Sequence, residues 1–198
     1  MDNYEIEKIR DTFSRLFVLG IKEKVNLYSF TYMLLKSKYV AQIEKNEYDE
    51  IFNKPVDVLF YLITGFNVSE ESSFGIYNDA YWCGQNYFDL HYRLNKSFEY
   101  IFLKFPLEHM INVYSIFHEM DFSSLVEHFK QKEKEKTILR LLCERDKCYL
   151  TDVSKKTGIN INTLKKINID DEYLYNASFQ IVSKIMIFFD VSFLLFVK

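Results

Sequence analysis

The chain has 198 residues, of which 48% are hydrophobic, and it carries 25 Lys or Arg against 28 Asp or Glu. This length fits one domain or two to three small ones, and the hydrophobic share is sufficient for buried cores. No apolar run is long enough to cross a bilayer, and the N-terminus lacks the basic and apolar segments of a signal peptide. The composition therefore predicts a soluble, cytoplasmic protein with no membrane contact.

The cysteines also indicate a reducing compartment. Cys83, Cys143 and Cys148 are too few for a disulfide framework. The spacing of Cys143 and Cys148 matches a zinc knuckle poorly, and no second cysteine pair follows. The sequence therefore predicts no metal and no other cofactor.

The N-terminal region reads as a set of short helices. Apolar residues recur at helical spacing over residues 4–19, and Gly20 follows as an expected C-terminal glycine. Three further helices are expected, from Asn26 to Leu34, from Ser37 to Ile43, and from Pro55 to Gly65. Residues 1–69 are therefore predicted to form one small helical domain.

The segment 67–79 is polar, rich in serine and contains Gly75, so we expect a domain boundary there. The following domain, residues 70–135, is rich in aromatic residues and is predicted to be mostly helical. Residues 98–105 form a dense apolar run that fits a strand or a buried helix equally well. Pro106 and Asp121 are each expected to begin a helix.

Positive charge is concentrated in one part of the chain. Residues 130–166 contain eleven Lys or Arg against five Asp or Glu, and the rest of the chain contains 14 against 23, a net charge of −9. A basic module on an acidic body is typical of a DNA-binding domain attached to a domain with another task. The alternative is that Lys130 to Lys136 is only a solvated helix face or a linker.

Residues 151–167 predict two short helices joined by a tight turn. Gly158 provides a residue that tolerates positive φ, and Thr151 and Asn160 are expected to cap the two helices. The small Ser154 allows the helices to approach closely. An apolar stripe that joins the pair is expected to consist of Val153, Ile159, Leu164 and Ile167.

The remaining side chains of this helix pair are suited to DNA. We expect Asn160, Asn162 and Thr163 on the second helix to approach base edges. The phosphate contacts are expected to come from the cationic side chains of both helices, which are Lys155, Lys156, Lys165 and Lys166.

Around this pair, one core helix is expected after Lys136, another is expected to begin at Asn176, and a last turn at Ser192. The order of these five helices resembles the DNA-binding domain of the lambda-repressor and Cro type, the XRE-like helix-turn-helix family. The motifs that carry the resemblance are Thr157-Gly158-Ile159, Thr163-Leu164 and Asp190 to Leu195. The resemblance covers about the last third of the chain and implies that the second helix of the pair is the recognition helix.

The sequence departs from the family pattern in two places. Asn168 stands where a Glu frequently follows the recognition helix, and the connection from Ile169 to Tyr175 is acidic because it contains Asp170, Asp171 and Glu172. Such charges would repel the DNA backbone.

The N-terminal domain resembles a second, degenerate copy of the same fold. Residues 37–48 are similar to the family's recognition helix, and residues 55–69 are similar to residues 178–192 of this chain. The first copy has no turn glycine and is surrounded by acidic residues, which favours a scaffold or dimerisation element. Chance similarity between short apolar helices is the competing explanation.

We therefore predict a mainly α protein with two helix-turn-helix-like domains, residues 1–69 and 136–198, flanking a middle domain. The predicted function is a sequence-specific transcriptional regulator that binds double-stranded DNA as a homodimer. The alternative is a protein-binding or inhibitor protein with helix-turn-helix folds as scaffold, docking a partner through aromatics at residues 77–91. That layout resembles proteins of phages and mobile elements that bind a host or defence protein. No enzymatic activity is predicted, since the four histidines are scattered and no phosphate-binding glycine loop is present.

Overall fold

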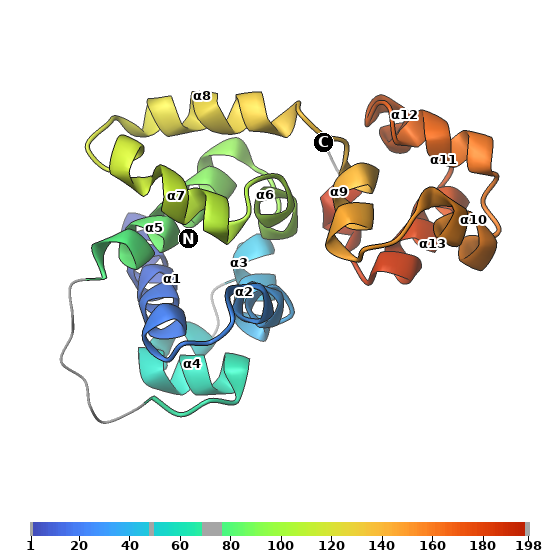
Figure 1. The fold of residues 1–198 in the computed structure, drawn as a ribbon. Helices are drawn as coiled ribbons and strands as arrows, with labels where there is room; N and C mark the ends of the chain where they lie inside the picture. The colour runs from blue at the N-terminus through green and yellow to red at the C-terminus, as the bar shows by residue number, and fades with distance from the viewer. Residues whose placement is uncertain (1, 48–49, 69–76, 197–198) are drawn as a thin grey trace. The chain divides into compact units, whose positions relative to one another are not determined.

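The computed structural model describes residues 2–47, 50–68 and 77–196, and these are mainly α-helical with no strand (Figure 1). The predicted mainly α class is confirmed. The ambiguous run at residues 98–105 is helical, as α6 (Phe98–Lys104). Within the described ranges, no helix has the length and hydrophobicity needed to cross a membrane.

The chain divides into two compact units. Unit 1 contains residues 1–98 and 106–125, and unit 2 contains residues 99–105 and 126–198. The boundary expected at residues 67–79 falls inside unit 1, although residues 69–76 lie outside the described ranges. The division differs from the three predicted domains because the helix that precedes this segment and the helix that follows it pack into one core.

Unit 1 begins with α1 (Asn3–Lys22) and continues through a series of shorter helices. These are α2 (Leu27–Leu35), α3 (Lys38–Glu44), the 3₁₀ helix η1 (Glu50–Asn53), α4 (Val56–Thr64), α5 (Asn78–Leu94) and α7 (Leu107–Phe117). The predicted caps are confirmed, since Asn26 Oδ1 accepts from the Ser29 amide at 3.1 Å and Ser37 Oγ accepts from the Val40 amide at 3.2 Å. Gly65 ends α4 with φ of +75°, as its position predicted.

Gly20 was expected to end the first helix, and this prediction is wrong. The helix continues to Lys22, and Gly20 is buried inside it. A Cβ at this position would lie 3.1 Å from the ring of Phe30, so the glycine makes room for an aromatic side chain from α2. Packing, and not a turn, explains this glycine.

The long helices α1 and α5 are in close contact along their length. A Cβ at Gly84 would lie 2.5 Å from the Cα of Ser14, so only glycine allows this approach. Polar pairs also join the two helices, since Arg10 donates to Asp89 at 2.8 Å and the Tyr81 hydroxyl donates to Asp11 at 2.6 Å. The contact explains why residues on both sides of the 67–79 segment belong to one unit.

The aromatic residues of unit 1 form its core. Phe13 stacks on Phe98 with ring centroids 4.8 Å apart, and Phe17 meets Phe30 edge-on at 5.3 Å. Tyr87 and Phe88 are 0% and 1% exposed. The expectation that aromatics of residues 77–91 form a docking surface is therefore wrong for these two rings, because α5 turns them toward α1.

His91 makes the stability of unit 1 dependent on pH. Its ring stacks on Phe98 at 4.2 Å, its Nδ1 lies 2.7 Å from the carbonyl oxygen of Lys96, and burial lowers its pKa. In the unfolded chain the His91 imidazole takes up a proton near pH 6.5, whereas in the folded chain it stays neutral at this pH. The contribution of neutral His91 to the free energy of unfolding is therefore present above pH 6.5 and is lost as the pH falls. His91 contributes at most about 1.4 kcal/mol per pH unit to the slope of the unfolding free energy against pH.

We therefore expect the unfolding free energy of unit 1 to fall between pH 6.5 and pH 5, and to fall less steeply in His91→Gln. Denaturant titrations measure this unfolding free energy. The fluorescence of Trp82, the single tryptophan of the chain, reports on unit 1 because Trp82 lies there beside Tyr114. Equal slopes in the two proteins would show that His91 is not the responsible group.

Unit 2 contains α6, most of α8 (Phe122–Glu133) and the C-terminal helices. The latter are α9 (Ile138–Arg145), α10 (Leu150–Thr157), α11 (Ile161–Ile167), α12 (Glu172–Tyr175), α13 (Phe179–Phe189) and the 3₁₀ helix η2 (Phe193–Phe196). The core of the unit includes Phe105 and Phe129, whose rings meet edge-on at 5.9 Å.

A buried cation on α6 joins three segments of unit 2. The Lys104 side chain is 1% exposed, and its Nζ lies 3.1 Å from Asp171 Oδ2. The same ammonium donates to the carbonyl oxygens of Glu133 at 3.0 Å and Lys136 at 2.6 Å. Because a buried charge is stable only when it is paired and hydrogen-bonded, these partners explain how Lys104 is accommodated.

Two of the predicted caps in unit 2 are wrong. Thr151 lies in the first turn of α10, and the Tyr149 amide, one residue before the helix, donates to Asp152 Oδ2 at 3.0 Å. Asn176 follows the end of α12, and Ser178 precedes α13. In both cases the residue at the N-cap position, Tyr149 or Ser178, lies two positions from the predicted cap, and a sequence pattern does not place a helix end more closely than that.

Candidate nucleic-acid interface

The turn between α10 and α11 has the geometry that its sequence predicted. Gly158 has φ of +70°, and its amide donates to the carbonyl oxygen of Ser154 at 2.9 Å. Ser154 Oγ then donates to the carbonyl oxygen of Ile159 at 2.7 Å. The turn is therefore fixed by hydrogen bonds from α10, and a side chain at position 158 would be strained by its backbone conformation.

The two helices are held together by the predicted apolar stripe. Val153 and Leu164 are fully buried, Ile167 is 1% exposed and Ile159 is 5% exposed. Asn160 begins α11, and its Oδ1 accepts from the amide of Asn162 at 2.8 Å. The stripe and this cap fix which face of α11 points away from α10.

The outward face of the helix pair is polar and cationic. Six predicted residues are exposed, namely Asn160, Asn162, Lys165 and Lys166 on or beside α11, and Lys155 and Lys156 on α10. Thr163 is only half-buried and lies between the exposed positions and the core. All seven predicted residues thus lie on two neighbouring helices of unit 2, and Asn160 uses one amide oxygen for capping.

The acidic residues that follow α11 have structural roles. Asp171 Oδ1 accepts from the amide of Ile138 at 2.7 Å, and its other oxygen pairs with buried Lys104. Asp170 Oδ1 accepts from the amide of Glu172 at 2.9 Å. The charge of Asp171 is therefore offset within the unit, which reduces the repulsion that the sequence predicted for DNA phosphates.

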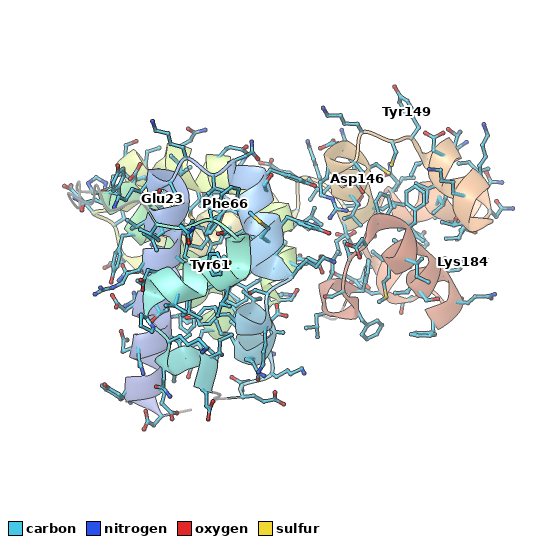
Figure 2. The ribbon with its side chains drawn as sticks, turned by 90° about the horizontal axis from the view of Figure 1, so that it is seen from below. Glu23, Tyr61, Phe66, Asp146, Tyr149 and Lys184 are labelled. Carbon is cyan, nitrogen blue, oxygen red and sulfur yellow. The ribbon has the colours of Figure 1, made fainter. Side chains whose placement is uncertain are left out.

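Lys184 is a further cation that the sequence did not single out. Its Nζ lies 3.8 Å from the position of a Cβ on Gly158, which brings it from α13 to the turn. Figure 2 shows Lys184 and Tyr149 projecting outward from the ribbon of unit 2, and Tyr149 is 77% exposed. No sequence signal indicates Lys184, because 25 residues separate it from the turn glycine.

The two thiols of unit 2 are Cys143, on α9, and Cys148, in the connection between α9 and α10. The amide of Cys148 donates to the carbonyl oxygen of Cys143 at 3.0 Å. Burial raises the pKa of Cys143 to about 12 and raises the pKa of Cys148, so both are protonated at neutral pH. Within residues 2–47, 50–68 and 77–196, no group of three or more His, Cys, Asp or Glu side chains is arranged to hold a metal ion.

The histidines pack within the units. His118 Nδ1 lies 2.9 Å from the carbonyl oxygen of Tyr114, and its Nε2 lies 3.6 Å from Glu119. His128 meets the ring of Phe105 edge-on, with centroids 5.6 Å apart. His91 is packed against Phe98, as described above.

Comparisons of the chain with protein-family models, curated proteins and solved structures find no match.

Proposed function

We propose that the chain is a sequence-specific DNA-binding regulator of transcription, and that α11 of an XRE-like helix-turn-helix enters the major groove. The observation that supports this most is the division of α11 into two faces. Leu164 and Ile167 are buried against the rest of unit 2, while Asn162, Lys165 and Lys166 are exposed. A major groove accepts a helix with such a polar outward face.

Each exposed side chain has a role in this proposal. Lys155, Lys156, Lys165 and Lys166 contact phosphates, which fixes the position of the unit on the duplex. The amide of Asn162 reads a base edge, since Asn pairs with adenine through two hydrogen bonds. Asn160 and Thr163 contribute secondary base contacts, because the first is partly engaged as a cap and the second is half-buried.

The charges of the two units support this placement. Unit 2 carries 14 Lys or Arg against 11 Asp or Glu, whereas unit 1 carries 11 against 17. The positive field therefore belongs to the unit that contains the helix-turn-helix, and it attracts DNA to that unit. A single module contacts few base pairs, so the regulator acts as a homodimer on half-sites about one helical turn apart.

Selection from a pool of random-sequence duplex DNA tests the proposal. The full chain is expected to enrich one defined sequence, and Asn162→Ala is expected to lose about 1–3 kcal/mol of discrimination at one base position. Exposed Gln180→Ala on α13 is the control and should leave the enriched sequence unchanged. No enrichment by the wild-type chain would overturn a sequence-specific function.

The alternative is a protein-binding or inhibitor protein that keeps the same helix pair only as a scaffold. The half-buried Thr163 and the exposed acidic residues Asp170 and Glu172 after α11 favour it over DNA binding. This alternative predicts that the chain retains no duplex DNA, even at low salt.

A further inference from the structure

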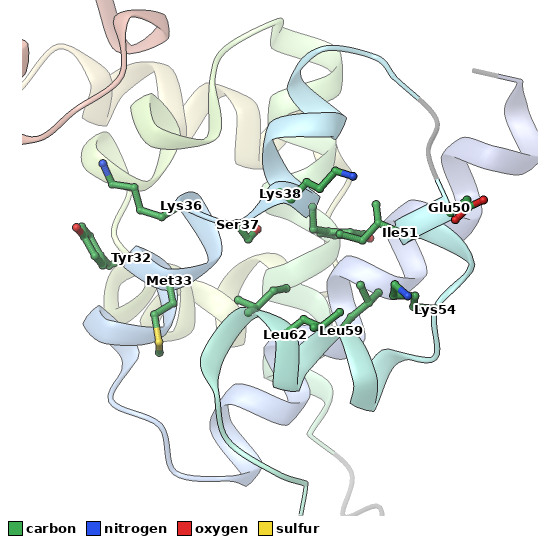
Figure 3. A pocket seen from close by; sticks show the side chains of 12 residues that line it. Tyr32, Met33, Lys36, Ser37, Lys38, Glu50, Ile51, Lys54, Leu59 and Leu62 are labelled. Carbon is green, nitrogen blue, oxygen red and sulfur yellow. The ribbon is translucent and has the colours of Figure 1, made fainter.

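Unit 1 contains a groove between α2, η1 and α4 (Figure 3). It has a volume of about 580 Å³, which is large enough for several apolar side chains of a partner. Its lining residues belong to α2, α3, η1 and α4 and to the connections between them, and are Tyr32, Met33, Lys36, Ser37, Lys38, Tyr39, Glu50, Ile51, Lys54, Leu59, Leu62 and Ile63.

The groove has an apolar floor and a basic rim. Leu59, Leu62 and Ile51 lie toward one another in Figure 3, with the lysine side chains around them. Lys36, Lys38 and Lys54 are exposed. The lining therefore carries three basic groups and one acidic group, Glu50.

This charge is opposite to that of its surroundings. Unit 1 as a whole has a net charge of −6, from 11 basic and 17 acidic residues. A basic rim on an acidic unit favours an acidic ligand, because complementary charge guides association and excludes partners of the wrong sign.

Further large apolar side chains are exposed on or beside the helices that line the groove. Leu62 on α4 is 56% exposed. Three aromatic side chains are exposed to a similar extent, namely Tyr28 on α2 (55%), Tyr61 on α4 (50%) and Phe66 just after α4 (54%). Large exposed apolar side chains on the helices that line a groove favour an interaction surface over a small-ligand site. The occupant is therefore longer than a molecule that only fills the groove.

We propose that this groove binds an acidic amphipathic helix of a partner protein. A helix fits because the groove is lined by helices and the short connections between them, so its described residues offer no strand edge for an extended peptide to pair with. Apolar residues on one face of the partner helix insert between α2 and α4, and its Glu or Asp residues lie beside Lys36 and Lys54. The adaptable Met33 side chain fits anchors of different shape. The proposal is independent of DNA binding by unit 2.

The test uses a pair of fluorescent helical peptides with the same Leu and Phe positions, flanked by Glu in one and by Lys in the other. Fluorescence anisotropy with the full chain is expected to show the acidic peptide binding at least about tenfold more tightly than the basic one. The double change Lys36→Glu and Lys54→Glu should reverse this preference, and Leu62→Asp should weaken the acidic peptide at least about tenfold.

Matched variants on other faces of unit 1 serve as controls. Ile116→Asp changes a residue that is 61% exposed on α7, and Lys24→Glu with Lys45→Glu reverses two exposed charges outside the groove lining. These controls should bind the acidic peptide like the wild type, and far-UV circular dichroism shows whether each variant is folded. Equal binding of both peptides, or wild-type affinity in folded Leu62→Asp, would overturn the proposal.

Two other occupants give distinct results. A second copy of the chain would produce a concentration-dependent dimer in light scattering that Leu62→Asp abolishes, and the acidic peptide would not bind. An amphiphilic anion would be indicated if decanoate bound with the affinity of the peptide and displaced it. Either result would replace the helix as the occupant of the groove.

Discussion

Replacing Lys165 and Lys166 together by alanine is expected to weaken binding of duplex DNA about 60-fold at 0.1 M salt. Each phosphate contact releases about 0.9 counterion, which corresponds to roughly eightfold in the binding constant at this salt concentration. The slope of log K against log salt should also become shallower by about 2, because two contacts are lost. Both side chains are exposed and Leu164 and Ile167 hold the helix, so the fold should be unaffected.

The matched control for this change is Lys130→Ala with Lys134→Ala. These lysines belong to the same basic region of the sequence but lie at the end of α8 or just after it, away from the helix pair in the sequence. Titrations of a labelled duplex at four salt concentrations separate the two cases. An equal loss in both double variants would mean that the basic composition, and not α11, attracts the DNA.

Gly84→Ala is expected to destabilise unit 1 by about 2–3 kcal/mol. A Cβ at this position would lie 2.5 Å from Ser14 Cα, 3.2 Å from the carbonyl oxygen of Phe13 and 3.2 Å from the ring of Phe17. Two of these neighbours are backbone atoms that no rotamer change can move away, so α1 and α5 must separate. Alanine gains about 1 kcal/mol in helix propensity over glycine, but this gain is smaller than the cost of the clash.

Urea unfolding followed by Trp82 fluorescence measures this effect, because Trp82 is on α5 next to the altered contact. Ser14→Ala is the control on the opposite helix, since its hydroxyl donates only within α1, to the carbonyl oxygen of Arg10 at 2.7 Å. Its cost should stay below about 1 kcal/mol. A Gly84→Ala protein with the wild-type midpoint would contradict the close helix contact.

The sequence predicted local structure well where a short-range signal exists. Asn26, Ser37 and Asn160 cap helices as expected, and Gly158 occupies the left-handed conformation of the turn. These features depend on a residue and its neighbours within three or four positions, so a single sequence is sufficient to predict them.

Long-range packing could not be predicted in the same way. Gly20 and Gly84 both lie inside helices, where a helical pattern would exclude glycine, because residues distant in the sequence fill the space beside them. The buried Lys104 has the same explanation, since its partners Glu133, Lys136 and Asp171 lie 29 to 67 positions away. The division into two units follows from such contacts, and the sequence alone suggested three domains.

In the candidate interface, too, the local features were predicted from the sequence and the long-range contacts were not. Periodicity over α11 separated buried Leu164 and Ile167 from exposed Lys165 and Lys166, because a helix of known phase has two faces. The pairing of Asp171 and the approach of Lys184 to the turn depend on α6 and α13, and no local pattern indicates either.

Hydrogen exchange of the full chain, with and without a saturating random-sequence duplex at low salt, tests directly whether α11 is the helix that binds DNA. DNA is expected to slow exchange in peptides covering residues 155–168, while peptides from the groove at residues 32–38 and 50–63 should exchange as in the free protein. Protection confined to unit 1, or no protection at residues 155–168 when the duplex is bound, would contradict the assignment of α11 as the DNA-binding helix.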